Sequence, residues 1–513
     1  MRKTITCICL LLLVFGCKKD PVNITVTTLP AAKAEVEFKL ETKNNTGKIT
    51  EDVTCIRNID NVSFYGSLSP LVESRNFIMT FKTLDAAAVV KVNDVVQTSG
   101  VTANDFSKPV TYSVSSGGSV KTYTIRIFNF TGIPVFNISS AGPIVSKDNY
   151  VTGNLTINAN GFAEQTVKSI DLQIKGRGNS TWALFDKKPY RLKFNTKTPV
   201  LGLPAAKNWV LLANYSDKTL MRNYLAFGVA QSLKSDYAPH GIFVEVYLNG
   251  YYRGNYLLTE QVEVDANRVN IKELKPANIS PAEITGGYLL ELENRVGETI
   301  SFRTKKDIPF VIKSPEDYVP EQLNYIQGYM QQTEDAIFAA NFTDPNNGYA
   351  KYINTDSFIN WFLVNELFKN EDAKKFSSMF YFKDRDGKMG MGPAWDFDLA
   401  AGNVNYSESV KPEGWWVKDG VWISRLYEDP AFKAKVKARW DVLKATGIPA
   451  MYASINATKN YLALSQSRNF TTWNILDTYV WPNPAIYHTY GGEVDQLNTW
   501  LTQRVAWLDS NIK

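Results

Sequence analysis

The chain has 513 residues, of which 44% are hydrophobic and 13% aromatic, so it can fold into two or more domains and is not a disordered protein. Its 56 basic and 51 acidic residues give a formal net charge of +5, a balance that argues against nucleic acid or an anionic membrane surface as a partner. The four cysteines and two histidines are too few to predict a disulfide framework or a cysteine-based metal site.

The start of the chain has the pattern of an exported lipoprotein. Residues 1–16 combine a basic tip with an apolar run that is shorter than the roughly 20 residues needed to span a bilayer. Cys17 follows and resembles the lipidated cysteine of a bacterial lipobox, so we predict a signal peptide over 1–16 and a lipid-anchored tether over 17–25. We therefore expect the protein in the cell envelope, held by the Cys17 lipid at the outer membrane, on its periplasmic or surface-exposed side. A free cysteine in an ordinary signal peptide is the alternative.

Short β-rich runs separated by glycine, asparagine and serine fill residues 26–130. Runs such as AEVEFKLE, NFIMTFK, PVTYSV and KTYTIRIFN recur about every ten residues with period-2 patterning, which is typical of a small β-sandwich. The stretch resembles the immunoglobulin-like spacer modules of bacterial surface lipoproteins, and it shows no cluster of catalytic residue types. We interpret it as an all-β immunoglobulin-like stalk.

From residue 131 onward the pattern is mixed. Strands are expected in the first part, interrupted by a helix over 217–233 that Asp217 is well placed to cap. Helices dominate the second part. A strand-rich half followed by a helix-rich half predicts an α+β, two-lobed catalytic domain over 131–513, so the chain as a whole is multidomain.

Two hairpins are predicted from their turn residues. Asn249-Gly250 lies between two runs of alternating apolar residues, and Asp386-Gly387 lies between two shorter runs. Acidic residues flank the second hairpin on both sides, which makes it the candidate site.

Asp396 and Asp398, in the stretch PAWDFD, directly follow that second hairpin. In extended chain residues i and i+2 point the same way, so the two carboxylates can face one point. Oxygen donors without a neighbouring histidine or cysteine suit Mg²⁺ or Mn²⁺ better than zinc. Asp372 precedes the hairpin, and the order of acid, hairpin and metal-type aspartate matches the catalytic base and magnesium ligand of protein kinases. A solvent-facing pair of aspartates is the structural alternative.

Basic residues that could meet phosphates lie upstream. Residues 175–182, KGRGNSTW, form a glycine-rich turn that could approach phosphates closely, and Arg177 could pair with them. Residues 187–194, KKPYRLKF, read as a strand that carries Lys188 among four basic side chains, a pattern also found on solvated strand faces. Glu260, at the end of the first hairpin, could partner one of these cations.

These stretches together resemble the spore coat protein H (CotH) family of atypical kinases. The matching segments follow the family's order over about 135–513: IKGRGNSTW, KKPYRLKF, NWVLLANYSDKTLMRN, VEVYLNGYYRGNYLLTEQVEV, GGYLLELEN and NEDAKKFSSMFYFKD…GPAWDFDLAAGN. The resemblance implies a distant kinase-like fold that binds ATP with Mg²⁺ or Mn²⁺ and phosphorylates Ser or Thr of a protein substrate.

The resemblance also implies roles for individual residues. The catalytic aspartate of the family's NxD motif falls on Asp372, which Asn370 precedes. The metal-binding acids of its WDxD motif fall on Asp396 and Asp398. The cofactor-binding positions fall, in chain order, on Arg177, Lys188, Glu260 and Asn370.

Two other functions are compatible with the sequence. At Ser377–Ser378 many family members carry an asparagine, a better metal ligand than serine, and a catalytically silent relative could serve as a surface binding or adhesion lipoprotein. The Trp-rich stretch 413–422 could then stack on a glycan. A metal-dependent phosphodiesterase is less well supported, because such two-metal sites usually include histidines. An exported, lipid-anchored, metal-dependent protein kinase is the leading hypothesis.

Overall fold

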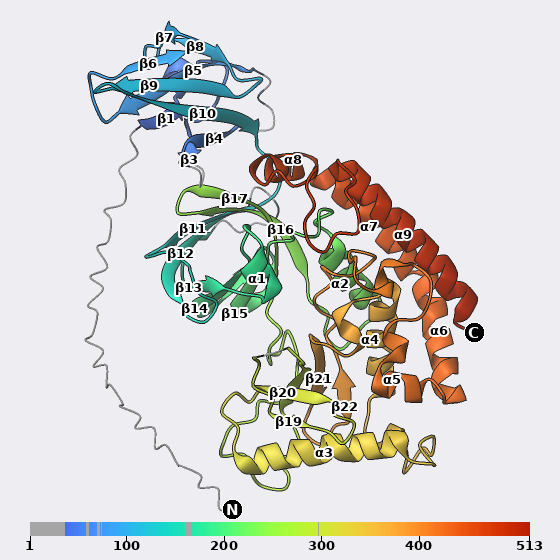
Figure 1. Ribbon diagram of the computed structural model, residues 1–513. Helices are drawn as coiled ribbons and strands as arrows, with labels where there is room; N and C mark the ends of the chain where they lie inside the picture. The colour runs from blue at the N-terminus through green and yellow to red at the C-terminus, as the bar shows by residue number, and fades with distance from the viewer. Residues whose placement is uncertain are drawn as a thin grey trace, which may run out of the picture.

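The computed structural model describes residues 36–57, 61–68, 72, 74–159, 162, 167–295 and 297–513 (Figure 1). The predicted signal peptide, Cys17 and the tether lie outside these ranges. Within them, no helix has the length and hydropathy needed to cross a bilayer. The chain is rich in β-structure, with two N-terminal sheets, a barrel, a further sheet and a helical region.

Two β-sheets pack face to face in the N-terminal part, as the period-2 runs predict. The first sheet has the order β2-β1-β5-β8, with β1 (Val36–Leu40), β2 (Val53–Thr54), β5 (Asn76–Thr83) and β8 (Ala103–Asp105). The second has the order β3-β4-β10-β9-β6-β7, with β3 (Ile56–Arg57), β4 (Ser63–Leu68), β6 (Val89–Val92), β7 (Val95–Val96), β9 (Val110–Ser116) and β10 (Ser119–Asn129). Both contribute to one apolar core, in which the Phe38 ring lies edge-on to Phe64 at 5.0 Å.

A closed seven-stranded barrel follows, and the sequence did not predict it. Its strands are β11 (Val135–Ser140), β12 (Val151–Asn158), β13 (Val167–Gly176), β14 (Tyr190–Val200), β15 (Leu203–Leu212), β16 (Gly241–Leu248) and β17 (Tyr251–Glu260). The order is β11-β12-β13-β14-β15-β17-β16, and parallel pairing of β11 with β16 closes the ring. The Asn249-Gly250 hairpin is confirmed, because β16 and β17 pair antiparallel across that turn and both residues have positive φ.

A third, five-stranded sheet links the barrel to the helical region. Its order is β19-β20-β18-β21-β22, with β18 (Tyr288–Leu292), β19 (Phe302–Arg303), β20 (Pro309–Ser314), β21 (Met379–Lys383) and β22 (Met389–Met391). β21 and β22 pair antiparallel on either side of Asp386-Gly387, which confirms the second predicted hairpin.

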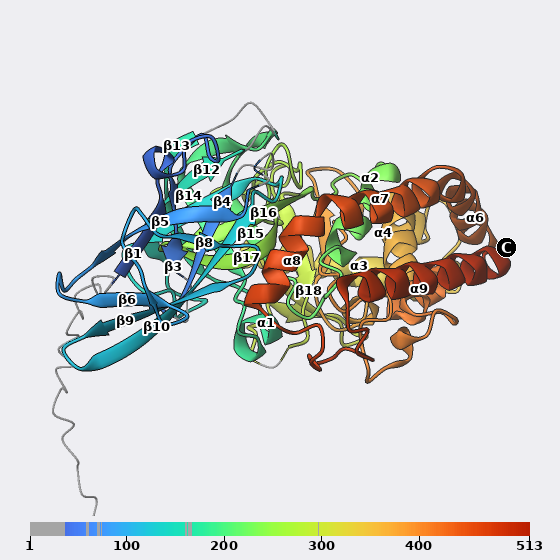
Figure 2. The same ribbon diagram turned by 90° about the horizontal axis from the view of Figure 1, so that it is seen from above.

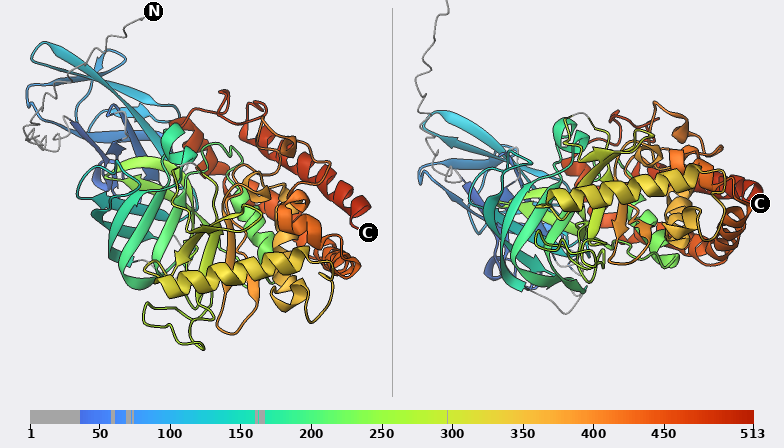
Figure 3. Two further views of the ribbon diagram at one scale, coloured as in Figure 1. Left: turned by 60° about the horizontal axis from the view of Figure 1, so that its bottom comes forward. Right: turned by 90° about the horizontal axis from the view of Figure 1, so that it is seen from below.

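Nine α-helices lie in the described part of the chain. They are α1 (Ser180–Leu184), α2 (Arg222–Ser232), α3 (Pro320–Phe338), α4 (Thr355–Phe368), α5 (Val421–Leu426), α6 (Pro430–Ala445), α7 (Gly447–Tyr461), α8 (Ala463–Thr472) and α9 (Tyr490–Asn511). Short 3-10 helices are η1 (Thr42–Asn44), η2 (Tyr349–Lys351), η3 (Asp372–Lys374), η4 (Glu408–Val410) and η5 (Val417–Asp419). α4 is buried along nearly its whole length, α8 packs against β17, and α7 and α9 extend away from the barrel (Figure 2). α3 runs along the underside of the third sheet and the helical region (Figure 3).

The helix predicted over 217–233 begins five residues later than expected. Leu220 has a φ of +63°, a left-handed conformation that a helix cannot contain, so residues 217–221 form a turn before α2. Asp217 nevertheless accepts a hydrogen bond of 2.9 Å from the backbone N–H of Arg222, the first helical residue.

The N-terminal sheets are docked onto the rest of the chain through an aromatic cluster. Tyr65 of β4 packs against Tyr252 of β17, with ring centroids 6.0 Å apart. Arg468 of α8 lies over the Tyr252 ring and donates a hydrogen bond of 2.9 Å to Ser67. The predicted stalk is therefore held against both the barrel and the C-terminal helices.

Candidate functional site

A cavity of about 430 Å³ opens between the barrel and the third sheet. One wall comes from β13, β14 and the turn after β13, and its basic side chains are Lys175, Arg177 and Arg191. The facing wall carries the acidic side chains Glu291, Glu293, Asp372, Asp396 and Asp398. A basic wall opposite an acidic one can hold a polyanion together with a cation.

The structure brings Asp372 and Asp396 together around one guanidinium group. Nη2 of Arg295 lies 3.4 Å from Oδ2 of Asp372 and 3.9 Å from Oδ2 of Asp396. The two carboxylate oxygens are therefore at most 7.3 Å apart, the sum of these distances. Nη1 of Arg295 also pairs with Glu293 at 2.8 Å, so the arginine is fixed from the sheet side.

Asp372 lies just after the C-terminal end of α4. Lys369 ends that helix in a left-handed conformation, with φ of +42°, and η3 begins at Asp372. Asn370 between them is buried, and its Nδ2 donates to the carbonyl of Trp395 at 3.1 Å. Asn370 thus ties the segment before the hairpin to the segment after it, next to Asp396.

Asp396 and Asp398 reach the cavity by a turn and not along a strand. β22 ends at Met391, and Asp396 has a φ of +66°, so the alternation expected of extended chain does not apply. The turn is held because the N–H of Phe397 donates to Asn223 at 2.8 Å. Both aspartates line the cavity all the same. A left-handed non-glycine residue beside a cavity is typical of functional sites.

The crowding of acids raises two pKa values. Removal from water and then the charge of Asp396 raise the pKa of Asp372 to about 6, against the opposing effect of Arg295. Burial, followed by the charges of Asp396 and Asp372, raises the pKa of Asp398 well above its ordinary value. Burial alone would lower the pKa of Arg295, but the surrounding carboxylates raise it. The site therefore favours an additional positive charge.

Ser377 and Ser378 stand where many family members carry an asparagine, and they contact these acids directly. Ser377 Oγ donates to Asp372 Oδ2 at 3.3 Å, and Ser378 Oγ donates to Asp396 Oδ2 at 3.1 Å. The two neighbouring hydroxyls thus orient the two carboxylates, one each. Ser378 also lines the cavity.

A model of the family described as CotH kinase protein matches residues 174–508. The chain belongs to the CotH kinase family. No curated protein matches the chain. Among solved structures, a glycoside hydrolase candidate from Bacteroides thetaiotaomicron is 18% identical over 35% of this chain, with a TM-score of 0.17. The chain covers 52% of that structure's length, and a similarity this low informs neither fold nor function.

Three residues predicted for the cofactor, Lys188, Glu260 and the buried Asn370, do not line the cavity of this CotH-family chain. Lys188 directs its Nζ to the carbonyl of Trp182 at 2.7 Å. Glu260 is buried, and its carboxylate accepts from the backbone N–H of His240 at 2.6 Å and contacts the His240 ring at 3.0 Å. The partner of Glu260 is therefore a histidine and not a strand cation, because the end of β17 faces residue 240, which lies just before β16.

Three residues that line the cavity were not predicted as site candidates from the sequence. Arg295 follows β18, and Lys175 pairs with Arg191 across β13 and β14. The alternation of side chains along β14 could have identified Arg191. Its neighbours Tyr190 and Leu192 point into the barrel, so the Arg191 side chain must point outward. Arg295 offered no such signal, since its place depends on how the third sheet meets the barrel.

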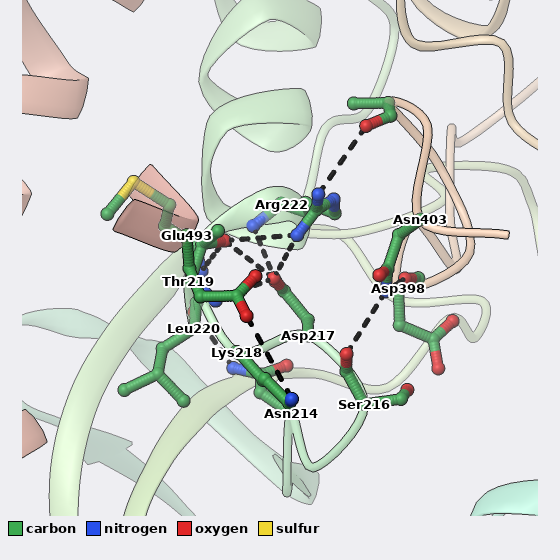
Figure 4. Close-up of polar contacts among 12 residues, drawn as sticks. Asn214, Ser216, Asp217, Lys218, Thr219, Leu220, Arg222, Asp398, Asn403 and Glu493 are labelled. Carbon is green, nitrogen blue, oxygen red and sulfur yellow. Dashed lines mark hydrogen bonds and ion pairs between the residues drawn. The ribbon is translucent and has the colours of Figure 1, made fainter. Parts of the chain in front are cut away.

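A second arginine–carboxylate cluster holds the loop after the WDFD motif of this kinase-family chain (Figure 4). Asp217 and Arg222 pair at 2.5 Å, and both side chains are almost completely buried. Arg222 Nε donates to the carbonyl of Ala400 at 3.0 Å, while Asn403 Nδ2 donates to the carbonyl of Asp398 at 2.7 Å. Arg222, at the start of α2, therefore holds the loop that directly follows Asp398.

Proposed function

We propose that the protein is an exported, lipid-anchored kinase that transfers the γ-phosphate of ATP to Ser or Thr of a protein substrate, with Mg²⁺ or Mn²⁺. The observation that supports this most is the shared contact of Asp372 and Asp396 with Arg295 in the cavity. In this proposal residues 131–513 form a two-lobed kinase-like domain. Residues 26–130 form an immunoglobulin-like spacer, and Cys17 carries the lipid.

The donor set fits a magnesium-type ion. Asp396 and Asp398 offer hard carboxylate oxygens, and the Ser378 hydroxyl lies beside them. No group of three or more histidine, cysteine or acidic side chains with metal-site geometry occurs among the described residues. Mg²⁺ is commonly held by one or two carboxylates, with phosphates and water completing its shell, so two aspartates suffice. When bound there, the ion would neutralise phosphate charge.

Each polar wall has a role in the proposed transfer. Arg177, Arg191 and Lys175 can pair with phosphate oxygens from the barrel side. The Asp372 carboxylate can take the proton of an acceptor hydroxyl, because a pKa of about 6 keeps it mostly ionised at pH 7 yet more basic than an ordinary aspartate. Arg295 lies between Asp372 and Asp396 and can pair with an oxygen of the phosphoryl group as it passes from ATP to the acceptor hydroxyl, with ADP as the leaving group.

A transfer assay tests the proposal. The mature protein is incubated with labelled ATP, Mg²⁺ or Mn²⁺ and a generic protein acceptor. Asp396→Asn is expected to abolish labelling, while Asp386→Asn at the tip of the same hairpin should label normally. Both aspartates have left-handed backbones, with φ of +66° and +54°, and asparagine tolerates that conformation, so the two variants are matched in backbone cost. Equal labelling by both variants would refute the proposed metal ligand.

A silent surface-binding lipoprotein remains the second candidate, and one surface feature favours it. Tyr406 and Trp481 are exposed and stacked, with centroids 5.9 Å apart and an angle of 11° between the rings. The predicted glycan platform over 413–422 does not take that form: Trp422 is buried, and Trp416 Nε1 donates to the carbonyl of Asn370. Oligosaccharide binding that disappears in Trp481→Ala, together with an inactive transfer assay, would support this candidate.

A further inference from the structure

A second cavity, of about 180 Å³, lies on the opposite face of the third sheet. Along β18 and the residues after it, Glu291 and Glu293 face the first cavity, whereas Leu292 and Asn294 line the second. The same alternation holds along β21, where Phe380 faces the first cavity and its neighbours Met379 and Tyr381 face the second. The two cavities therefore stand back to back across shared strands.

The second cavity is lined mainly by apolar and aromatic side chains. Phe358 and Trp361 come from α4, Tyr381 from β21, and Trp422 and Ile423 from α5. Protein interiors hold few voids larger than a water molecule, and an apolar cavity of about 150 Å³ is enough to bind benzene. This space is thus suited to one aromatic ring or a short branched aliphatic group.

The mouth of this cavity has an excess of positive charge. Four charged residues line it: Lys306, Asp307, Lys374 and Lys375. Asp307 is paired with Arg303 at 3.1 Å, and Lys374 is paired with Asp419 at 3.4 Å. Within the described ranges, no ion pair joins the ammonium group of Lys306 or Lys375 to a carboxylate, although the backbone N–H of Lys306 donates to Glu334 at 2.9 Å and its ammonium lies over the Phe338 ring at 4.3 Å. Two exposed ammonium groups next to an apolar space complement an apolar ligand that ends in an anion.

We infer that this cavity is a binding site for a small amphiphilic carboxylate, with its apolar group against Trp361 and Trp422 and its carboxylate at Lys306 and Lys375. The site also adjoins the catalytic segment, because Ala373 in its wall follows Asp372, and Asn294 precedes Arg295. The inference does not depend on phosphoryl transfer, since binding can be measured without ATP.

Calorimetric titration of the mature protein with 3-phenylpropionate, in the absence of nucleotide, tests the site. The control ligand is 3-phenylpropanamide, which has the same ring and chain but no charge. We expect the carboxylate to bind about three- to tenfold more tightly than the amide, the scale of one or two partly exposed ion pairs. Equal affinities, or no binding of either compound at millimolar concentration, would overturn the inference.

Two variants locate the site. Lys306→Gln combined with Lys375→Gln should remove the preference for the carboxylate and leave amide affinity unchanged. Val421→Trp, at an exposed position in the cavity wall, should weaken both ligands at least fivefold by filling the space, whereas Val442→Trp on the exposed face of α6 should not. Thermal unfolding followed by circular dichroism checks that each variant is folded. Wild-type binding by folded Val421→Trp would place the ligand elsewhere and overturn the assignment.

Discussion

Two of the arginine–carboxylate clusters in the described part of the chain, one around Arg222 and one around Arg295, have the same chemistry but differ in how completely their groups are hydrogen-bonded. Asp217 and Arg222 lie 2.5 Å apart with side chains 0% and 7% exposed. Asp217 also accepts from the backbone N–H groups of Thr219 and Arg222, so both of its oxygens are hydrogen-bonded. Around Arg295 the contacts to Asp372 and Asp396 are 3.4 and 3.9 Å, and these side chains are 18–28% exposed.

The difference in burial and contact distance indicates that the Asp217–Arg222 cluster has a structural role, whereas the Arg295 cluster is suited to bind a ligand. Short, buried and fully bonded charges hold one geometry, and they cannot accept another partner without losing what they have. Longer and partly exposed contacts leave hydrogen-bonding capacity for a ligand, and the raised pKa of Asp372 shows that its charge is incompletely compensated. The Asp217 cluster holds the loop, and the Arg295 cluster retains hydrogen-bonding capacity for a ligand.

The largest expected effect is the loss of activity on substitution of Asp372 or Asp396, the two acids that contact Arg295. The two substitutions should impair different steps. Asp372→Ala is expected to lower turnover by roughly two or more orders of magnitude with little change in nucleotide affinity, because a base acts mainly in the transition state. Asp396→Asn should weaken metal-dependent nucleotide binding as well as turnover. Steady-state kinetics with calorimetry separates the two. Loss of nucleotide binding in Asp372→Ala with retention in Asp396→Asn would reverse the roles.

Substitution in the buried Asp217–Arg222 cluster should mainly lower the stability of the folded protein. Asp217→Ala leaves the buried Arg222 guanidinium without its carboxylate, and we expect a loss of about 3–5 kcal/mol in the free energy of unfolding. Urea denaturation measures it. Asp335→Ala, at a half-exposed surface ion pair, is the control and should change stability by about 0.5 kcal/mol or less. Similar losses in both variants would contradict the assignment of a scaffold role.

Removing the charge of Asp372 should stabilise the protein. Its pKa is about 6 in the folded chain against an ordinary 3.8, so the folded state loses stability as pH rises from about 4 to about 6. Asp372→Asn avoids this penalty and should gain about 1–2 kcal/mol at pH 7, after allowance for weaker contacts with Arg295. The gain should vanish near pH 4. Unfolding measured at both pH values tests it, and a destabilised variant at pH 7 would show that Asp372 is satisfied like Asp217.

The smallest effect on the site should come from deleting residues 26–130. No described residue of this segment lines the cavity, so the fragment 131–513 should bind nucleotide within about twofold of the full chain. Its stability should fall, because Tyr252 and Arg468 lose the cover of Tyr65 and Ser67. A folded fragment that no longer binds nucleotide would show that the spacer contributes to the site.

Local rules predicted the parts of the structure that depend on neighbouring residues. Asn249-Gly250 forms a hairpin because the left-handed backbones of both residues match the twist of the paired strands, and in the Asp386-Gly387 hairpin Asp386 is left-handed. Asp372 and Asp396 were predicted to lie close together because one short hairpin separates them, and both contact Arg295. The order of motifs also identified the family, which the match over 174–508 confirms.

Features that depend on long-range packing were not predicted. Closure of the barrel pairs Val135 with Glu245, two residues that no local pattern connects. Arg295 reaches Asp372 only because β18 and β21 are neighbours in the third sheet. Lys188 was assigned from the family resemblance, whereas Arg191, which alternates with the barrel-facing Tyr190 and Leu192, lines the cavity.

Calorimetric titration of the mature protein with ATP, first alone and then with Mg²⁺, tests the central claim most directly. The Asp372, Asp396 and Asp398 carboxylates stand beside the space proposed for the phosphates, and without a metal they repel the triphosphate. We predict weak or undetectable binding of ATP alone and clear binding once Mg²⁺ is present. Equal binding in both conditions, or no binding in either, would contradict it.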